Sequence, residues 1–496
     1  MISLSGHLPV LVVVAPLMTA PVIVALRRSG AAWALTVAVC WACLAMSVLL
    51  LGQVLDTGSF SYLLGGWAAP WGIEYRVDPV DAFVLVIVST VASVVSLYAK
   101  TSVAAEIDPE RQYLFYTMFV LCLCGMLGMA VTGDAFNLFV FLEISSLSTY
   151  VLVGLGRDRR ALTASLRYLI LGTVGATFYV IGVGLAYMMT GTLNMADLAQ
   201  RLPEMAHTST VRASLAFLVV GIGLKMAAFP LHAWLPNAYA FAPSAAAAFL
   251  AGTATKVSVY VFLRIVLGVF GGTGLLTELP VAEVLMVLAL AGMFIGSAVA
   301  IWQPDLKRAL AYSSVAQIGY ILLGIAIMNE TGLAASIVHL FNHAVMKSAL
   351  FLALGAVVFR TGSARIDSFK GIGRRMPLTM SAILVAGLSL IGVPLTVGFV
   401  SKWYLVEAAL DAGLWPVAVL ILLSSLLAVA YVWRIVEAAW FAQPSAALAH
   451  VREAPTALLV PTWALTGAAV WFGLDATQTM GVARVAAQAL LKGMAP

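Results

Sequence analysis

The sequence predicts an all-α membrane protein that crosses the bilayer about 14 times. Its composition, its apolar runs and the placement of its charges each predict this. Of the 496 residues, 62% are hydrophobic and only 10% are charged, whereas soluble globular proteins average about 45–50% apolar and about 25% charged residues. This excess of apolar side chains excludes a soluble enzyme, a secreted disulfide scaffold and a disordered tail. Basic residues never cluster with aromatic ones, which argues against nucleic-acid binding.

Apolar runs long enough to cross a membrane recur along the whole chain. The apolar core of a bilayer is about 30 Å thick and takes about 20 mostly apolar helical residues. Such runs predict 14 crossings, at residues 7–26, 32–52, 78–98, 112–132, 135–155, 163–190, 211–229, 244–270, 281–302, 307–328, 333–359, 377–408, 414–440 and 456–474. The remaining stretch, 476–494, is expected to be an interfacial helix.

The basic residues of the connections predict the orientation. With the N-terminus outside, 15 of the 27 Lys and Arg residues fall in inner connections and five in outer connections or the tail. Positive charge favours inner loops, so this split supports both the crossing count and the orientation. No basic residue precedes the first apolar run, which argues against a cleaved signal peptide. A multi-pass protein of the bacterial cell (inner) membrane is expected.

The seventh and twelfth crossings carry helix breakers beside a lysine. Pro230 and Pro236 follow Lys225, and Pro394 precedes Lys402. Each proline frees a carbonyl one turn earlier, and broken helices at membrane depth lie in protein or line a cavity. Because the breaks are five crossings apart, they predict two inverted five-helix repeats. The expected division is 1–110 for crossings 1–3, 111–272 for crossings 4–8, 273–440 for crossings 9–13, and 441–496 for crossing 14 and a C-terminal tail.

One acid and several lysines stand deep in predicted crossings, among them Glu143, Lys225, Lys256 and Lys402. A Lys or acid at a helix centre costs about 2.5–3.5 kcal/mol, which a simple anchor would not carry. Burial lowers the pKa of a lysine and a nearby carboxylate raises it, so groups set between these effects exchange protons near neutral pH. The set predicts a proton path, and if Glu143 and Lys225 face each other, loosening of the pair would shift the proton affinity of Lys225. The alternative is that each charge only pairs with a neighbour and holds helices together. Three arginines lie within about two turns of a helix end or can extend toward one: Arg167, Arg264 and Arg434.

A second group of ionisable residues shares one helical stripe. His339, His343 and Lys347 are spaced i, i+4 and i+8. Three such groups in a row predict a proton connection. Two histidines without a carboxylate make a poor metal site, so neither a metal nor a cofactor is expected. His232, in the first broken crossing, either joins the connection or caps the break.

With these residues in view, the chain resembles the antiporter-like subunits shared by respiratory complex I, membrane-bound hydrogenases and Mrp-type monovalent cation/proton antiporters. The resemblance runs from about Asp78 to about Glu437. It rests on GDAFNLFVFLEISSLSTY, LKMAAFPLHAWLPNAYAFAPS, TKVSVYVFLR, LKRALAYSSVAQIGY, HLFNHAVMKSALFL and GVPLTVGFVSKW. It implies 14 helices, two inverted five-helix units and a polar axis at the midplane. The residues it marks are, for proton transfer, Glu143, Lys225, Lys256 and Lys402, and, as connections, His339 and His343.

Within that family, TKVSVYVFLR and SSVAQIGY resemble the D subunit of the Mrp-type antiporter. The resemblance implies the proton-translocating subunit of a sodium or potassium/proton antiporter, a transport subunit rather than an enzyme. Its implied partners are other membrane subunits, protons, and Na+ or K+. Two alternatives within the family stay open, a proton-pumping subunit of a complex I-like NADH-quinone oxidoreductase and one of a membrane-bound hydrogenase. Lys402 argues against the complex I subunit type that has glutamate there. A third alternative is a scaffold that conducts nothing.

Overall fold

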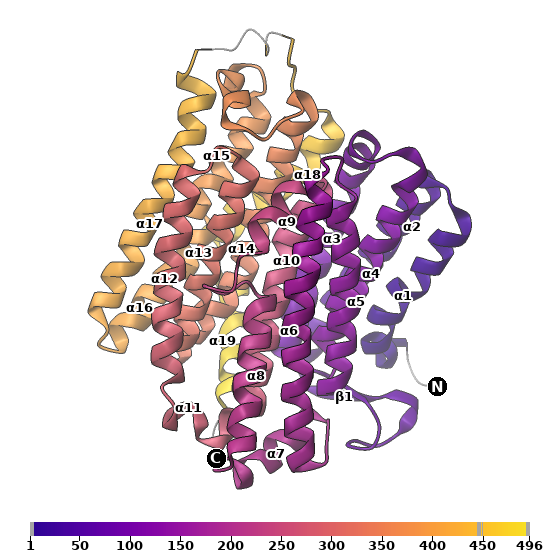
Figure 1. Cartoon of the computed structure of the whole chain (residues 1–496), viewed down its shortest axis with the longest axis vertical. Helices are drawn as coiled ribbons and strands as arrows, with labels where there is room; N and C mark the ends of the chain where they lie inside the picture. The colour runs from indigo at the N-terminus through magenta and orange to yellow at the C-terminus, as the bar shows by residue number, and fades with distance from the viewer. Residues whose placement is uncertain (1–3, 444–447, 449, 493–496) are drawn as a thin grey trace.

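The computed structural model describes residues 4–443, 448 and 450–492, and long helices running along one axis make up most of it (Figure 1). The helices up to the first break are α1 (Leu8–Leu26), α2 (Ser29–Thr57), α3 (Pro79–Glu106), α4 (Gln112–Val131), α5 (Ala135–Gly154), α6 (Arg160–Thr190), α7 (Met195–Met205) and α8 (Ser209–Lys225). Those that follow are α9 (Leu235–Phe241), α10 (Ser244–Phe262), α11 (Leu275–Glu278), α12 (Val281–Trp302), α13 (Leu306–Ala326), α14 (Glu330–Thr361), α15 (Pro377–Ile391), α16 (Val397–Asp411), α17 (Trp415–Val436), α18 (Thr456–Leu474) and α19 (Thr477–Lys492).

Short elements connect or extend these helices. Strands β1 (Phe60–Leu63) and β2 (Glu74–Val77) pair antiparallel, with Phe60 opposite Val77. Two π-helical turns extend α10 and α17, at Leu263–Val269 and Glu437–Phe441. The 3-10 turns are Leu4–His7, Leu64–Gly66, Pro109–Arg111, Gly271–Thr273, Ile366–Phe369 and Ile372–Arg374.

The predicted crossing count is confirmed. Among the described residues, 12 helices are long and apolar enough to cross a membrane. Two further crossings consist of shorter helices, α8 with α9 and α15 with α16, each pair interrupted between its members. These are the predicted seventh and twelfth crossings. The seventh crossing is the fourth of crossings 4–8, and the twelfth is the fourth of crossings 9–13. Because each run has an odd number of crossings, equivalent helices of the two runs point in opposite directions, as inverted repeats require.

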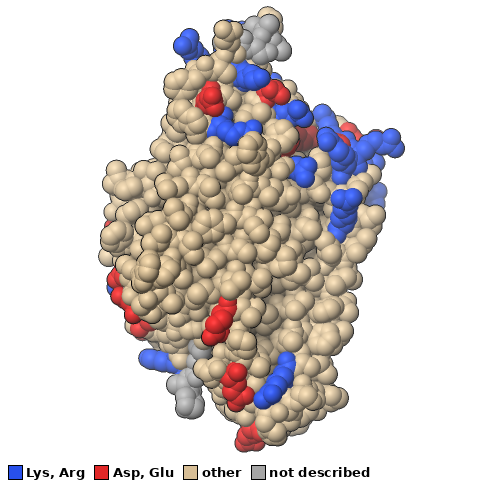
Figure 2. All heavy atoms as spheres, turned by 60° about the vertical axis from the view of Figure 1, so that its left-hand side comes forward, with Lys and Arg blue, Asp and Glu red and all other residues tan. Residues whose placement is uncertain are grey.

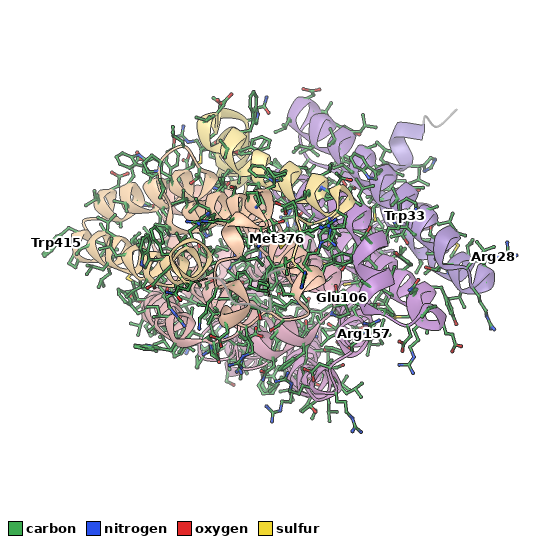
Figure 3. All side chains as sticks on the ribbon, turned by 90° about the horizontal axis from the view of Figure 1, so that it is seen from above. Arg28, Trp33, Glu106, Arg157, Met376 and Trp415 are labelled. Carbon is green, nitrogen blue, oxygen red and sulfur yellow. The ribbon has the colours of Figure 1, made fainter. Side chains whose placement is uncertain are left out.

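The two ends of the bundle differ in charge. Basic side chains gather at one end, and a broad apolar band separates it from the other (Figure 2). We call the first the basic end; it carries the connections with Arg157, Arg160, Arg365 and Lys370. The opposite end carries the β1–β2 hairpin and α7, and we call it the hairpin end (Figure 1). In cross-section the bundle is elongated, with Arg28 at one extremity and Trp415 at the other (Figure 3).

Helix α14 is the centre of the bundle. All its side chains from Gly332 to Val357 are buried, and it contacts α3, α10, α13, α15, α16, α18 and α19. A helix covered on all sides fits a sequence that is apolar all round. Its few polar side chains therefore lie in the protein interior, where they need protein partners.

Two elements differ from the expectation. Helix α7, which the crossing list passes over, is short and amphipathic and buries Leu198 and Leu202. The C-terminal stretch is not a separate interfacial helix, because α19 packs along α14 and α3 and continues the path of α18. Its buried face consists mostly of small residues, which allow close helix packing. Near its end, Gln488 donates a hydrogen bond of 2.9 Å to Glu330 in the first turn of α14.

Candidate proton-transfer path

The first break lies between α8 and α9 and follows from its sequence. Pro230 has no backbone donor, and Pro236 occupies the first turn of α9, where a missing donor costs nothing. Ahead of both prolines, directly after the end of α8, the backbone turns through Ala227, which has a positive φ of 56°. The Trp234 indole donates a 2.8 Å hydrogen bond to the Leu224 carbonyl, which also accepts from the Ala227 backbone N–H at 3.3 Å.

Lys225 and Glu143 face each other beside this break. Lys225 is the last residue of α8, and its Nζ lies 3.5 Å from Glu143 Oε1 of α5. The same Nζ donates a 2.7 Å hydrogen bond to Ser146 Oγ, one turn further along α5. The C-terminal end of a helix also favours a cation. The ammonium is therefore held by a carboxylate, a hydroxyl and a helix end.

A small polar gap lies on the other side of Lys225. It measures about 20 Å³ and is bordered by α4, α5, α8 and α10, including Thr149, Ala254 and Ser258. A cavity of this size has room for about one water molecule. The gap opens from Lys225 onto α10, the helix that carries Lys256.

Lys256 is 1% exposed, among the most deeply buried lysines of the described chain. Its Nζ donates to the Ala251 carbonyl of its own helix. Helix α10 packs against both α8 and α14. Lys256 therefore belongs to the layer between the first break and the histidine stripe.

The stripe on α14 lies wholly inside the protein. The rings of His339 and His343 stack with centroids 5.9 Å apart. Lys347 donates a 2.7 Å hydrogen bond to the Leu310 carbonyl and a second one to Ser313 Oγ, both on α13. Neither ring nitrogen of His343 has a hydrogen-bond partner among the described residues. Buried ring nitrogens without a hydrogen-bond partner are uncommon in proteins.

His339 connects the stripe to the second break. Its Nε2 lies 3.0 Å from Gln317 Oε1 and its Nδ1 lies 2.6 Å from Ser401 Oγ. Since the amide oxygen only accepts, Nε2 carries the proton and Nδ1 accepts from the Ser401 hydroxyl. Ser401 directly precedes Lys402 in α16.

The second break holds Lys402 differently. Helix α15 ends at Ile391, Gly392 has a φ of 95° and Leu395 a φ of 73°. Lys402 Nζ reaches back to donate to the carbonyls of Leu390 (3.1 Å) and Ile391 (2.8 Å). It also lies 4.6 Å from the centre of the Tyr320 ring, within cation–π range.

His232 stands apart from this row. It is half-buried, its ring stacks on Phe229 with centroids 5.5 Å apart, and it meets Tyr312 edge-on. Among the described residues, no hydrogen bond joins the His232 side chain to another residue predicted for the path, and its Nδ1 has no hydrogen-bond partner. Its backbone carbonyl accepts from the Leu235 N–H at 3.1 Å at the start of α9, and both expected roles stay predictions.

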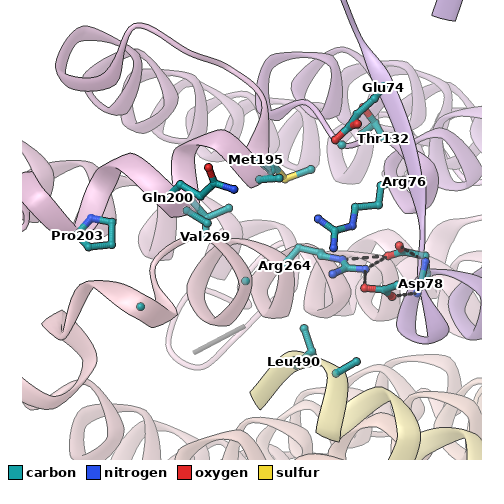
Figure 4. A pocket seen from close by; sticks show the side chains of 17 residues that line it. Glu74, Arg76, Asp78, Thr132, Met195, Gln200, Pro203, Arg264, Val269 and Leu490 are labelled. Atoms are coloured by element: carbon teal, nitrogen blue, oxygen red, sulfur yellow. Dashed lines mark hydrogen bonds and ion pairs between the residues drawn. The ribbon is translucent and has the colours of Figure 1, made fainter. Parts of the chain in front are cut away.

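A charged cluster near the hairpin end was missed in the sequence. Arg264 pairs with Asp78 and Asp81 and donates to Asp81 from Nε at 3.0 Å. Tyr260 donates to the same carboxylate at 2.5 Å. Burial alone would raise the pKa of Asp78, but the charge and hydrogen bonds of Arg264 lower it below its usual value. The cluster lines a cavity of about 570 Å³ (Figure 4). A detectable signal was the DPVD sequence, whose acids form a capping box at the start of α3.

A second missed group lies at the basic end. Lys307, expected among the inner connections, is buried and donates to the Ala242 carbonyl (3.3 Å) and to Ser244 Oγ (3.2 Å). Glu106 accepts from the Ser244 backbone N–H at 2.9 Å. Both charged residues line a cavity of about 420 Å³ at this end.

The arrangement is a row of buried or half-buried ionisable side chains. Within the described residues, no three His, Cys, Asp or Glu side chains lie together in a way that could hold a metal ion. Glu143 of α5 contacts Lys225 of α8 through its side chain. From there the row continues through helices that pack on one another, α8 on α10, α10 on α14 and α14 on α16, with Lys256, the histidine stripe and Lys402.

Comparison with known proteins places this geometry in a family. Residues 132–428 match the family described as "NADH:quinone oxidoreductase/Mrp antiporter, TM". The chain therefore belongs to the antiporter-like membrane subunits that redox complexes and cation/proton antiporters share, and the resemblance stated from the motifs is confirmed at this level.

Particular relatives come from both branches of the family. The chain is 43% identical to the N subunit of the NADH-quinone oxidoreductase of Desulforudis audaxviator, over 95% of this chain and 96% of that protein. It is 33% identical to the D subunit of the Na(+)/H(+) antiporter of Alkalihalophilus pseudofirmus, over 74% and 73%. A chain of the Mrp complex from a Dietzia species superposes with a TM-score of 0.90 at 27% identity, covering 98% of each chain. We expected an Mrp D subunit within the family. The sequence identity to this D subunit is 33%, lower than the 43% identity to the N subunit.

Proposed function

We propose that the chain moves protons through the membrane along the row from Glu143 to Lys402, as a subunit of a redox-driven complex of the NADH-quinone oxidoreductase type. The observation that carries the proposal is the Lys225–Glu143 pair, 3.5 Å apart, at the start of a row of buried ionisable groups. Charges this deep are costly, and a row of them has a use only if protons pass along it. The basic end is proposed to face the inside, with the N-terminus outside.

The first step follows from the pair itself. While Glu143 stays near, Lys225 favours the protonated state, because the carboxylate stabilises the ammonium. If Glu143 moves away, burial dominates and Lys225 releases its proton. The polar gap next to Lys225 leads toward α10 and Lys256.

The later steps use the polar partners of the row. Lys256 passes the proton to the stripe, where His343 has two nitrogens without partners among the described residues. His339 then exchanges it through the Ser401 hydroxyl, beside Lys402. A histidine that binds donors and acceptors on opposite ring nitrogens relays a proton by exchanging its tautomer.

Membership of a redox-driven complex is supported by the identity of 43% to an oxidoreductase N subunit over nearly the full length of both chains. On this proposal the electron-transfer chemistry belongs to partner subunits. This chain would respond to it through its membrane contacts.

A second candidate is exchange of protons for Na+ or K+ in an Mrp-type complex. The observation in its favour is the superposition on a chain of the Mrp complex with a TM-score of 0.90 over 98% of both chains. The same row would then serve a transporter that is driven by an ion gradient.

One experiment separates the two. The chain is purified with its native partners in mild detergent, the partners are identified by mass spectrometry, and the complex is reconstituted in vesicles with a fluorescent pH probe. Redox-driven translocation predicts iron–sulfur or flavin absorbance and acidification on addition of an electron donor. Gradient-driven exchange predicts a pH change after a NaCl or KCl pulse without any donor. A complex that gives neither response contradicts proton translocation.

A further inference from the structure

The break between α18 and α19 lies within the apolar band of the molecule. Phe472 packs against Phe341 with ring centroids 5.0 Å apart, and Phe341 lies between His339 and His343 on α14. A Cβ added at Gly473 would lie 2.7 Å from the Leu395 carbonyl oxygen. Leu395 belongs to the second break, which two helices of 15 residues each, α15 and α16, place midway between the two ends.

Asp475 follows Phe472 by three residues, which is about 5 Å along a helix. Its side chain is exposed. One carboxylate oxygen accepts from the Thr477 backbone N–H at 3.0 Å and from the Thr477 hydroxyl. Among the described residues, no basic side chain forms an ion pair with it.

The surface around this carboxylate is apolar. Leu395, Trp471 and Leu474 are 64%, 64% and 61% exposed. Lipid tails offer neither a hydrogen-bond donor nor a counter-charge, so an ionised acid exposed to them at this depth carries a free-energy cost beyond what the two Thr477 hydrogen bonds supply. We call the face made by Leu395, Trp471, Leu474 and Asp475 the Asp475 face. Among the described residues, it lacks a basic partner for its carboxylate.

A second copy of the chain does not provide that partner in a two-fold pair. The basic residues of α18 and α19 are Arg484 and Lys492. Arg484 follows Asp475 by nine residues, or about 13 Å along the helix. Rotation about the membrane normal keeps every residue at its depth, so a copy would bring its own Asp475, and not Arg484, to this carboxylate.

We propose that the Asp475 face binds a transmembrane helix of a different membrane subunit, one that presents a Lys, Arg or His side chain to Asp475 near mid-membrane. Charge complementarity selects this occupant, because a cation on a neighbouring helix satisfies the carboxylate where lipid does not. The proposal rests on membership of a multi-subunit complex. It does not depend on proton translocation by this chain.

The test replaces the carboxylate with an apolar side chain, Asp475→Leu, in the complex purified with its native partners in mild detergent. If the face binds a partner through Asp475, recovery of that partner falls about tenfold or more, while the isolated variant melts no lower than the wild type. Asp56→Leu, at the exposed end of α2, is the matched control and leaves recovery unchanged. Wild-type recovery with Asp475→Leu overturns the proposal.

A second measurement does not depend on the variant's stability. A photo-crosslinking amino acid is placed at Leu474, with Val287 of α12, which is 65% exposed, as control. The expected result is one adduct to a membrane subunit from Leu474 and only lipid adducts from Val287. Lipid adducts alone at both positions overturn the proposal. This outcome would leave proton translocation untouched, so the two proposals fail separately.

Discussion

The two broken crossings hold their lysines in opposite electrostatic settings. In the first, Lys225 is the end of α8 and has a carboxylate, Glu143, 3.5 Å away. In the second, Lys402 stands inside α16 and reaches back to the carbonyls at the end of α15. Among the described residues no carboxylate forms an ion pair with Lys402. Both ammonium groups thus lie at the C-terminal end of a half-helix, but only the first has a counter-charge within the chain.

This difference indicates distinct roles for the two breaks. A buried ammonium beside a carboxylate stays charged until the pair separates. A buried ammonium that is held only by neutral oxygens loses its proton more readily. Under the proposed function, the first break would respond to movement of Glu143, whereas the second would respond to protons that arrive from His339 and Ser401. Substitutions at each break test this contrast.

The largest effect is expected from Glu143→Gln. The amide keeps the shape but removes the charge that controls Lys225, so proton translocation should fall about 100-fold or more, as for loss of a positioned proton-transfer group. The rate is measured in vesicles by quenching of a pH-sensitive dye. Glu407→Gln, an exposed position on α16, is the control and should keep the wild-type rate. A Glu143→Gln complex with normal transport would refute the role of the pair.

Thermal unfolding should show that substitution of the two lysines changes the stability of the protein in opposite directions. Lys402→Met removes a buried charge without leaving an acid unpaired, so stability should stay equal or rise. Lys225→Met leaves Glu143 without its cation and should cost about 1–3 kcal/mol. The double change Glu143→Gln with Lys225→Met should recover part of that loss. Equal shifts for both single variants would contradict the contrast between the breaks.

Gly392→Ala should damage the second break in particular. The position has a φ of 95°, and a Cβ there would lie 2.9 Å from Lys402 Cδ. Strain of about 1–3 kcal/mol and displacement of the ammonium should slow translocation about tenfold. Gly413→Ala is a matched control, since its φ is 72° with open space around it. It should lose stability but keep the transport rate. Equal transport defects in both variants would mean that strain alone is responsible.

The smallest effect is expected from Ser401→Ala, which removes the hydroxyl between His339 and Lys402. Loss of one hydrogen bond of about 1 kcal/mol predicts a slowing of about fivefold. Ser401→Thr keeps the hydroxyl and should restore the rate. If alanine and threonine behave alike, the hydroxyl does not lie on the path.

Much of the fold was predictable because membrane helices obey local rules. Apolar runs, loop charges and the prolines beside Lys225 and Lys402 each report on a short segment, and they predicted 14 crossings with breaks in the seventh and twelfth. The division into residues 111–272 and 273–440 and the roles assigned along the path stay predictions. The pairing of Arg264 could not be predicted, because its position near a helix end says nothing of the acids at the start of α3.

The sequence by itself determined that this is a polytopic membrane protein of the antiporter-like family, and which buried charges it carries. Those properties depend on composition, periodicity and motifs, which are local. Only the tertiary structure decided which polar side chains meet. It pairs Glu143 with Lys225, and Arg264 with Asp78 and Asp81. It also places the Ser401 hydroxyl against His339. The tertiary structure also packs the C-terminal helix α19 along α14 and exposes Asp475 on an apolar face. The physical reason is that pairing depends on how helices distant in sequence pack side by side, and mid-membrane residues on different helices carry no local signal of their neighbours.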